Sequence, residues 1–134
     1  AKKGLVTVSL IWNTADDLDL HLVRSDRLPS LGTYNNPDMI YYGNTQNGWG
    51  HLDIDMNVRP ETNKPVENIY MAHLEPGMFG VYVHYFRSHT RMPTVKFRVI
   101  IQREGEEKPR VINNAVVFAQ HNTKSKKVFE FRIP

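Results

Sequence analysis

Cysteine is absent from all 134 residues of the chain. This absence excludes disulfide bonds and cysteine-ligated zinc, and it leaves the cellular compartment open. Long apolar runs are also missing, because none approaches the ~20 residues that a membrane-spanning helix needs. We therefore expect no membrane span. The opening residues, Ala-Lys-Lys-Gly, lack the features of a signal peptide, so we expect none in this chain.

Two further absences concern helices and catalysis. No stretch repeats apolar residues at the helical period over roughly ten positions or more. The sequence also lacks a Gly-x-Ser-x-Gly nucleophile elbow, a phosphate-cradling glycine loop and a His-Glu-x-x-His motif. An enzyme is therefore not the expected class, although a metal-dependent hydrolase stays open as an alternative.

Charge is modest in amount and uneven along the chain. Lys and Arg number 17 against 14 Asp and Glu, which gives a net charge of +3. Basic residues gather in the C-terminal part, whereas Asp residues gather in the first half. A mildly basic surface is usually a solvated one, so we do not expect a nucleic-acid partner.

Short runs of alternating apolar and polar residues are abundant, and they predict β-strands separated by Gly, Pro and Asn turn signals. The connection between the first two runs is too short for a crossover helix, so an antiparallel pair or a change of sheet is expected there. We predict one domain over residues 1–134, an all-β antiparallel β-sandwich of the jelly-roll or C2/Ig-like kind with long loops. The predicted strands cover residues 5–12, 17–23, 39–42, 51–58, 67–72, 79–86, 95–102, 111–118 and 128–133.

The side chains best suited to chemistry lie on two of these strands. Residues 16–21 read Asp-Asp-Leu-Asp-Leu-His, and residues 51–57 read His-Leu-Asp-Ile-Asp-Met-Asn. In both, aliphatic residues alternate with carboxylates and imidazoles, so each strand has one apolar and one polar face. Carboxylates on neighbouring strands repel, and a cation between them removes that cost. We therefore expect the two strands to lie together around a divalent cation. The candidate ligands are Asp17, Asp19, Asp53, Asp55, His21, His51 and His84, with Asp16 and Asn57 as further oxygen donors.

Ca²⁺ is the first candidate ion, because it binds six to eight oxygen donors at about 2.3–2.6 Å. If His21, His51 and His84 lie on neighbouring strands, two or three imidazoles with one Asp suit Zn²⁺ or Mn²⁺ instead. The alternative is a solvated polar face without an ion. Asp is disfavoured in the middle of a strand, which favours the cation.

Several aromatic residues cannot all face the core under these alternations. Either they form a second hydrophobic layer under the long loop of residues 24–38, or they line a surface for a protein or carbohydrate partner. We expect a non-catalytic binding or interaction module stabilised by a divalent cation. A metal-free structural or assembly component, secreted or of a virion, is the other alternative, and the oligomeric state is left open. The aromatic residues are Tyr34, Tyr41, Tyr42, Trp49, Tyr70, Tyr82 and Phe86.

A series of motifs in fixed order carries a family resemblance. Val-Ser-Leu-Ile-Trp-Asn is followed by Asp-Leu-Asp-Leu-His-Leu-Val, Ile-Tyr-Tyr-Gly-Asn, His-Leu-Asp-Ile-Asp-Met-Asn and Pro-Gly-Met-Phe-Gly-Val-Tyr-Val-His-Tyr. Over residues 6–101 this order resembles the YfaP-like group of bacterial domains of unknown function. The Asp-Leu-Asp element is also similar to those of TerD-type tellurite-resistance domains and bacterial pre-peptidase C-terminal domains, which are calcium-binding β-sandwiches. The resemblance implies a sandwich fold, a metal at Asp17 and Asp19, and a location outside the cytoplasm.

Overall fold

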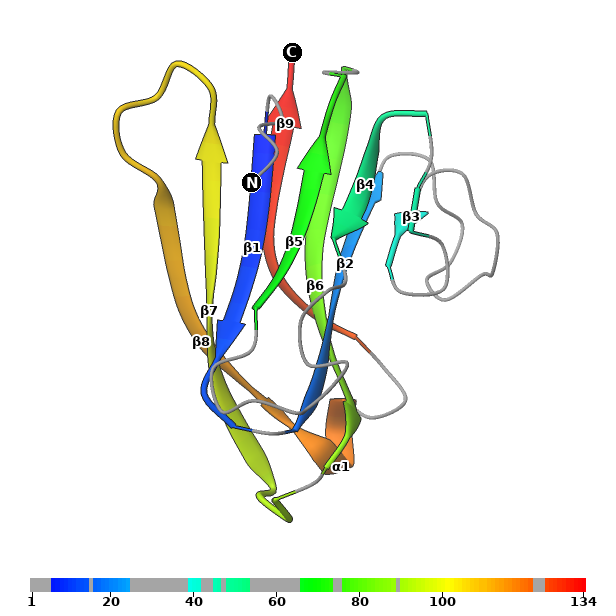
Figure 1. Cartoon of the computed structure of the whole chain (residues 1–134), viewed down its shortest axis with the longest axis vertical. Helices are drawn as coiled ribbons and strands as arrows, with labels where there is room; N and C mark the ends of the chain where they lie inside the picture. The colour runs from blue at the N-terminus through cyan, green and yellow to red at the C-terminus, as the bar shows by residue number, and fades with distance from the viewer. Residues whose placement is uncertain are drawn as a thin grey trace.

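Two antiparallel β-sheets pack face to face in the computed structural model of the chain (Figure 1). One sheet has five strands in the order β4-β5-β1-β7-β8, and the other has four in the order β3-β2-β6-β9. The predicted all-β antiparallel sandwich is therefore confirmed. The structure describes residues 6–14, 16–24, 39–41, 45–46, 48–53, 66–73, 76–88, 90–121 and 125–134.

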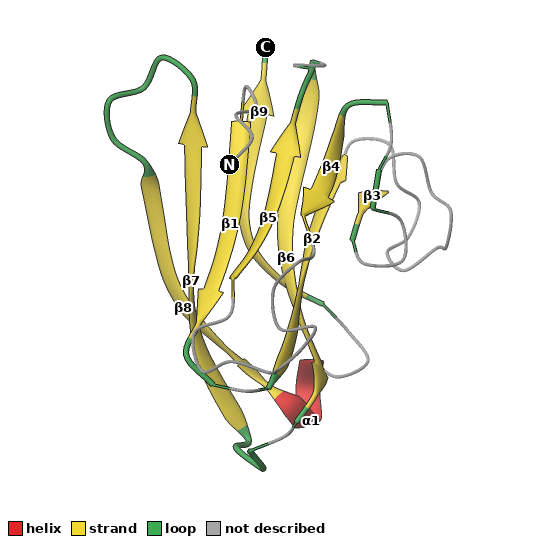
Figure 2. Cartoon of the chain, in the orientation of Figure 1, coloured by secondary structure: helices red, strands yellow, loops and turns green. Residues whose placement is uncertain are grey.

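Nine strands and one short helix make up these residues (Figure 2). Most strands lie within two residues of their predicted bounds. Of the strand predicted at 51–58, only residues 51–53 fall among the described residues, and they belong to a strand that begins at Gly50. The four-residue helix was not predicted, because it is too short to show a helical period. No helix in the described ranges has the length and apolar character to cross a membrane. The elements are β1 (Val6–Trp12), β2 (Asp17–Arg24), β3 (Met39–Ile40), β4 (Gly50–Asp53), β5 (Val66–Met71), β6 (Gly77–Arg87), β7 (Thr94–Arg103), β8 (Arg110–Val117), α1 (Phe118–His121) and β9 (Lys126–Ile133).

The core fills the space between the two sheets. Strand β1 sends Val8 and Leu10 inward from the five-stranded sheet, and both are fully buried. From the four-stranded sheet, strand β2 contributes Leu18, Leu20 and Leu22 to the same core, and these are also buried. Because side chains alternate along a strand, these leucines direct Asp19 and His21 to the outer face of the four-stranded sheet.

The chain changes from one sheet to the other between β1 and β2. A change of sheet was one of the two predictions for this connection, the other being an antiparallel pair. This change separates the two acidic strands, because β2 pairs with β3 and β6 whereas β4 pairs with β5. The expectation that the strands of residues 17–23 and 51–58 lie side by side is therefore wrong. Similar patterns on two strands show that each has one apolar face, and they do not show that the strands belong to one sheet.

Asp16 holds the β1–β2 connection in place and is fully buried. Its carboxylate accepts hydrogen bonds from the Thr14 hydroxyl at 2.8 Å and from the backbone N–H and hydroxyl of Thr90 at 2.8 and 2.7 Å. Its carbonyl accepts a bond of 2.7 Å from the indole N–H of Trp12. These bonds give Asp16 a structural role, joining the end of β1 to the loop between β6 and β7.

Candidate metal centre

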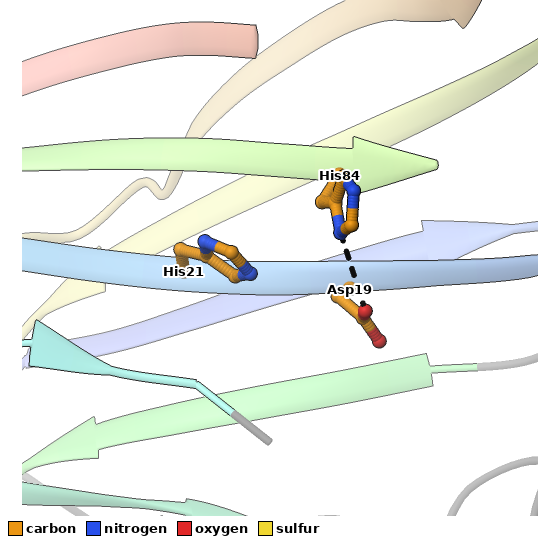
Figure 3. A group of neighbouring side chains, drawn as sticks. All are labelled: Asp19, His21 and His84. Carbon is orange, nitrogen blue, oxygen red and sulfur yellow. Dashed lines mark ion pairs between the residues drawn. The ribbon is translucent and has the colours of Figure 1, made fainter. Parts of the chain in front are cut away.

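Strand pairing brings two histidines and an aspartate together on the outer face of the four-stranded sheet. Asp19 of β2 lies opposite His84 of β6, and His21 follows two positions along β2 on the same face. Figure 3 shows Asp19 and His21 on β2 and His84 on the neighbouring strand β6. Each residue offers one ligand atom, and these atoms lie within 4.8 Å of one another. Among the described residues, no other group of His, Asp and Glu meets this criterion.

The distances within this group suit a shared ion better than a direct hydrogen bond. Asp19 Oδ2 lies 3.6 Å from His84 Nδ1 (Figure 3), which is longer than a hydrogen bond. Two donors of a tetrahedral ion with bonds of ~2.1 Å lie about 3.4 Å apart. The rings of His21 and His84 are tilted by 53° with centroids 5.9 Å apart. The three ligand atoms lie within 4.8 Å of one another, so side-chain rotation toward a common centre is needed for all three to bind one ion.

Asp19 and His21 each have one buried side-chain atom that lacks a hydrogen bond. Asp19 is 8% exposed and His21 is 6% exposed. Within the described part of the chain, Asp19 Oδ2 and His21 Nε2 have no hydrogen-bond partner. A buried polar atom left in this way costs about 1–3 kcal/mol. A cation bound between these atoms removes that cost for both of them.

Neighbouring side chains set the orientation of the His21 ring. Its Nδ1 lies 3.1 Å from the hydroxyl of Ser125, just before β9. The Tyr41 ring packs on its other side, with ring centroids 5.0 Å apart and a tilt of 57°. With Nδ1 engaged by the hydroxyl, Nε2 is the nitrogen available to the site. Metal-binding histidines generally have such a partner on the other ring nitrogen.

Burial controls the protonation of the group. It lowers the pKa of His21 to about 3, with a smaller contribution from His84, so the imidazole is neutral at pH 7. Burial also raises the pKa of Asp19, an effect that the adjacent His84 partly offsets and the charge of Asp17 adds to. A neutral imidazole is the form that binds a metal. A buried carboxylate with a raised pKa is one that a cation stabilises.

Glu67 of β5 lies close to the site and was not among the sequence candidates. It sits opposite Leu10 on the inward face of β5, and its Oε1 accepts a 3.1 Å hydrogen bond from the backbone N–H of Leu20. Strand β3 pairs with β2 only at Leu22 and Val23. The Glu67 carboxyl therefore accepts the hydrogen bond of the Leu20 N–H, which this short strand does not reach. Burial, followed by the charge of Asp19, raises the pKa of Glu67 to about 8. The sequence did hold a signal, namely an acidic residue at an inward position of a predicted strand.

The remaining predicted ligands do not join this group within the described residues. His51 stacks on Tyr70 of β5, with ring centroids 5.2 Å apart, in the five-stranded sheet. Asp17 is half-buried at the start of β2, before a register shift, and lies outside the group. Asp55 and the side chain of Asp53 lie outside the described residues. The sequence prediction thus included all three members of the group, together with two residues that lie outside it, Asp17 and His51.

Of the aromatic residues that the sequence analysis named, most of the described ones are buried rather than exposed at the surface. Tyr41, Trp49 and Tyr70 are buried, whereas Phe86 is 42% exposed. Tyr41 and the half-buried Tyr82 pack with Val23 and Met39 in a small apolar cluster next to the His21 ring. Tyr34 and Tyr42 lie outside the described residues. The apolar cluster excludes water from one side of the group formed by Asp19, His21 and His84. The lower local dielectric strengthens electrostatic interactions within that group.

No family model matches this sequence, and neither a curated protein nor a solved structure matches it. The resemblance to the YfaP-like group stays a prediction. Function is therefore inferred from the geometry of the site.

Proposed function

We propose that the chain is a non-catalytic binding module whose sandwich is stabilised by one divalent metal ion held by Asp19, His21 and His84. One observation carries this proposal. Asp19 Oδ2 and His21 Nε2 are both buried without a hydrogen-bond partner in the described ranges, and Asp19, His21 and His84 each offer a ligand atom within 4.8 Å of the other two. One ion bound between them provides a partner for both of these unpaired atoms.

The donor set favours Zn²⁺ over the Ca²⁺ that the sequence pattern placed first. Two of the three donors are imidazole nitrogens, which suit Zn²⁺ and other transition metals. Ca²⁺ takes six to eight oxygen donors, and this group provides one carboxylate. Mn²⁺ accepts the same mixed set and stands second.

Bound metal stabilises the fold by mass action. The ligands belong to the native pairing of β2 with β6, which the unfolded chain does not retain. A ligand present at 100 times its Kd adds about 2.7 kcal/mol to the free energy of unfolding. The ion also removes the desolvation cost of the Asp19 carboxylate.

Zinc titration calorimetry on metal-stripped protein tests the proposal, with His84→Ala as the site variant and His73→Ala as the matched control. His73 is an exposed histidine outside the ligand group, so its loss leaves the site intact. We expect one Zn²⁺ per chain in the wild type and in His73→Ala, and none in His84→Ala. Weaker binding of Mn²⁺ and Ca²⁺ is expected in parallel titrations. Absence of zinc binding, or equal binding by all three proteins, contradicts the proposal.

A metal-dependent hydrolase is the second candidate, and the number of ligands favours it. Catalytic zinc sites use three protein ligands and leave the fourth position to water, which the metal acidifies. The group here also has three protein donors within the described residues. Hydrolysis of an activated ester by the zinc-loaded wild type, lost in His84→Ala and kept in His73→Ala, supports this alternative. Equal rates for the three proteins exclude it.

A further inference from the structure

A hollow of about 410 Å³ opens on the outer face of the five-stranded sheet, on the opposite side of the sandwich from the metal group. A row of side chains runs across four strands at this place. Arg98 of β7 lies opposite Ile11 of β1 on one side and Asn113 of β8 on the other, and Ile11 lies opposite Val66 of β5. Neighbouring strands are about 4.8 Å apart, so the row spans roughly 14 Å. These four residues all line the hollow.

Two cationic side chains line this hollow, and neither is paired with a carboxylate within the described ranges. Lys96 and Arg98 occupy alternate positions of β7, project from the same face and are exposed. Alternate residues of a strand lie about 7 Å apart. Neither cation has an ion-pair partner among the residues that the structure describes. The hollow therefore favours a ligand that places negative charge beside Lys96 and Arg98.

The rest of the lining combines an apolar floor with amide groups. Ile11 and Val66 are half-buried and provide aliphatic surface. Asn13 and Asn113 are exposed at the rim, and each amide can both donate and accept hydrogen bonds. A fitting ligand thus presents an aliphatic face, several hydroxyl-like groups and carboxylates.

The position of the hollow argues against a peptide that joins the sheet as an additional strand. It lies on a sheet face, where β1 and β7 are each paired on both sides. Peptides that add to a sheet need the free N–H and C=O groups of an edge strand. Recognition here depends on side chains, which suits a sugar ring with its C–H face, hydroxyls and acid group.

We propose that this hollow binds an acidic oligosaccharide, with its carboxylates on Lys96 and Arg98, a ring face on Ile11 and Val66, and hydroxyls on Asn13 and Asn113. Arg98 can pair with a carboxylate through two parallel hydrogen bonds. A hollow of about 410 Å³ falls in the range of small-ligand pockets, roughly 300–1,000 Å³. This site is separate from the proposed metal centre and does not depend on it.

Calorimetric titration with trigalacturonate at low salt tests the inference. We expect binding by the wild type, at least tenfold weaker binding by Lys96→Gln and by Arg98→Gln, and unchanged binding by Lys108→Gln. Lys108 is an exposed cation at the tip of the β7–β8 hairpin and serves as the matched control. The neutral trisaccharide maltotriose should bind at least tenfold more weakly than trigalacturonate. All three changes are at exposed positions, and thermal melts verify that each variant folds.

Several outcomes overturn the inference. These are no binding of trigalacturonate, equal binding of maltotriose, or the same affinity in Arg98→Gln as in Lys108→Gln. Binding of an acidic peptide or a short oligonucleotide through Lys96 and Arg98, without binding of trigalacturonate, also overturns it. The titrations are repeated with Asp19→Asn, which removes a proposed metal ligand. Sugar binding should persist there, so failure of one proposal is distinguishable from failure of the other.

Discussion

Asp19→Asn should invert the order of stability between wild type and variant when zinc is added. In the metal-free protein the Asp19 carboxylate is buried, and Oδ2 has no hydrogen-bond partner among the described residues. Burial raises its pKa, so the ionised form opposes folding near neutral pH. An amide of the same shape carries no charge and avoids most of that cost. We expect the metal-free variant to equal the wild type or to exceed it by up to about 1–3 kcal/mol.

Zinc reverses this order because the variant loses its only anionic ligand. At 1,000 times its Kd, Zn²⁺ adds about 4.1 kcal/mol to the free energy of unfolding of the wild type, which exceeds the advantage of the metal-free variant. The variant retains two imidazole donors and should gain little over the same concentration range. The sign of the difference in unfolding free energy therefore changes between chelator and zinc.

Urea unfolding followed by tryptophan fluorescence measures both free energies. Trp12 and Trp49 are 3% exposed, so their emission reports loss of the core. Asp16→Asn is the matched control, because Asp16 is hydrogen-bonded within the fold and should be destabilised equally in chelator and in zinc. If Asp19→Asn is destabilised by the same amount in chelator and in zinc, the carboxylate has a structural role. That result contradicts metal binding by Asp19.

Three other substitutions test further parts of the structure. The pKa of Glu67 rises from 4.5 to about 8 on folding, so the metal-free protein should lose stability as the pH rises through that interval. Glu67→Gln should flatten this part of a urea-unfolding pH profile, and an unchanged slope contradicts the assignment. Asp16→Ala removes the bonds to Thr90 and should cost about 2–4 kcal/mol in chemical unfolding, whereas a loss below 1 kcal/mol counts against a structural role. Ser125→Ala removes the partner of His21 Nδ1 and should weaken zinc binding about 10- to 100-fold in competition with a chromogenic chelator. Unchanged affinity shows that the hydroxyl does not position the ring.

The sequence predicted the fold well because a half-buried strand has a strong local signal. The alternation in β1 and β7 gave their bounds to within one residue, and the short β1–β2 connection allowed the change of sheet that the structure has. Helix α1 escaped prediction because four residues cannot show a period. Local pattern thus determined which residues form strands and which face of each strand is buried.

The site was only partly predictable because strand order is a long-range property. The Asp-Leu-Asp-Leu-His pattern placed Asp19 and His21 on one face, and this is correct. Nothing within that pattern shows whether β4 or β6 is the neighbour of β2, so His51 and His84 were equally good candidates. Glu67 and Ser125 come from β5 and the segment before β9, and pairing alone brings them to β2. Their contributions become visible only with the three-dimensional structure.

X-ray absorption spectroscopy of the zinc-loaded protein tests whether Asp19, His21 and His84 together hold one ion. We predict one Zn²⁺ per chain with nitrogen and oxygen ligands at about 2.0–2.2 Å and scattering from two imidazole rings. His84→Ala should lose the metal, and with it the imidazole scattering. A spectrum with oxygen ligands alone, or one that is the same in His84→Ala, contradicts a centre built from Asp19, His21 and His84.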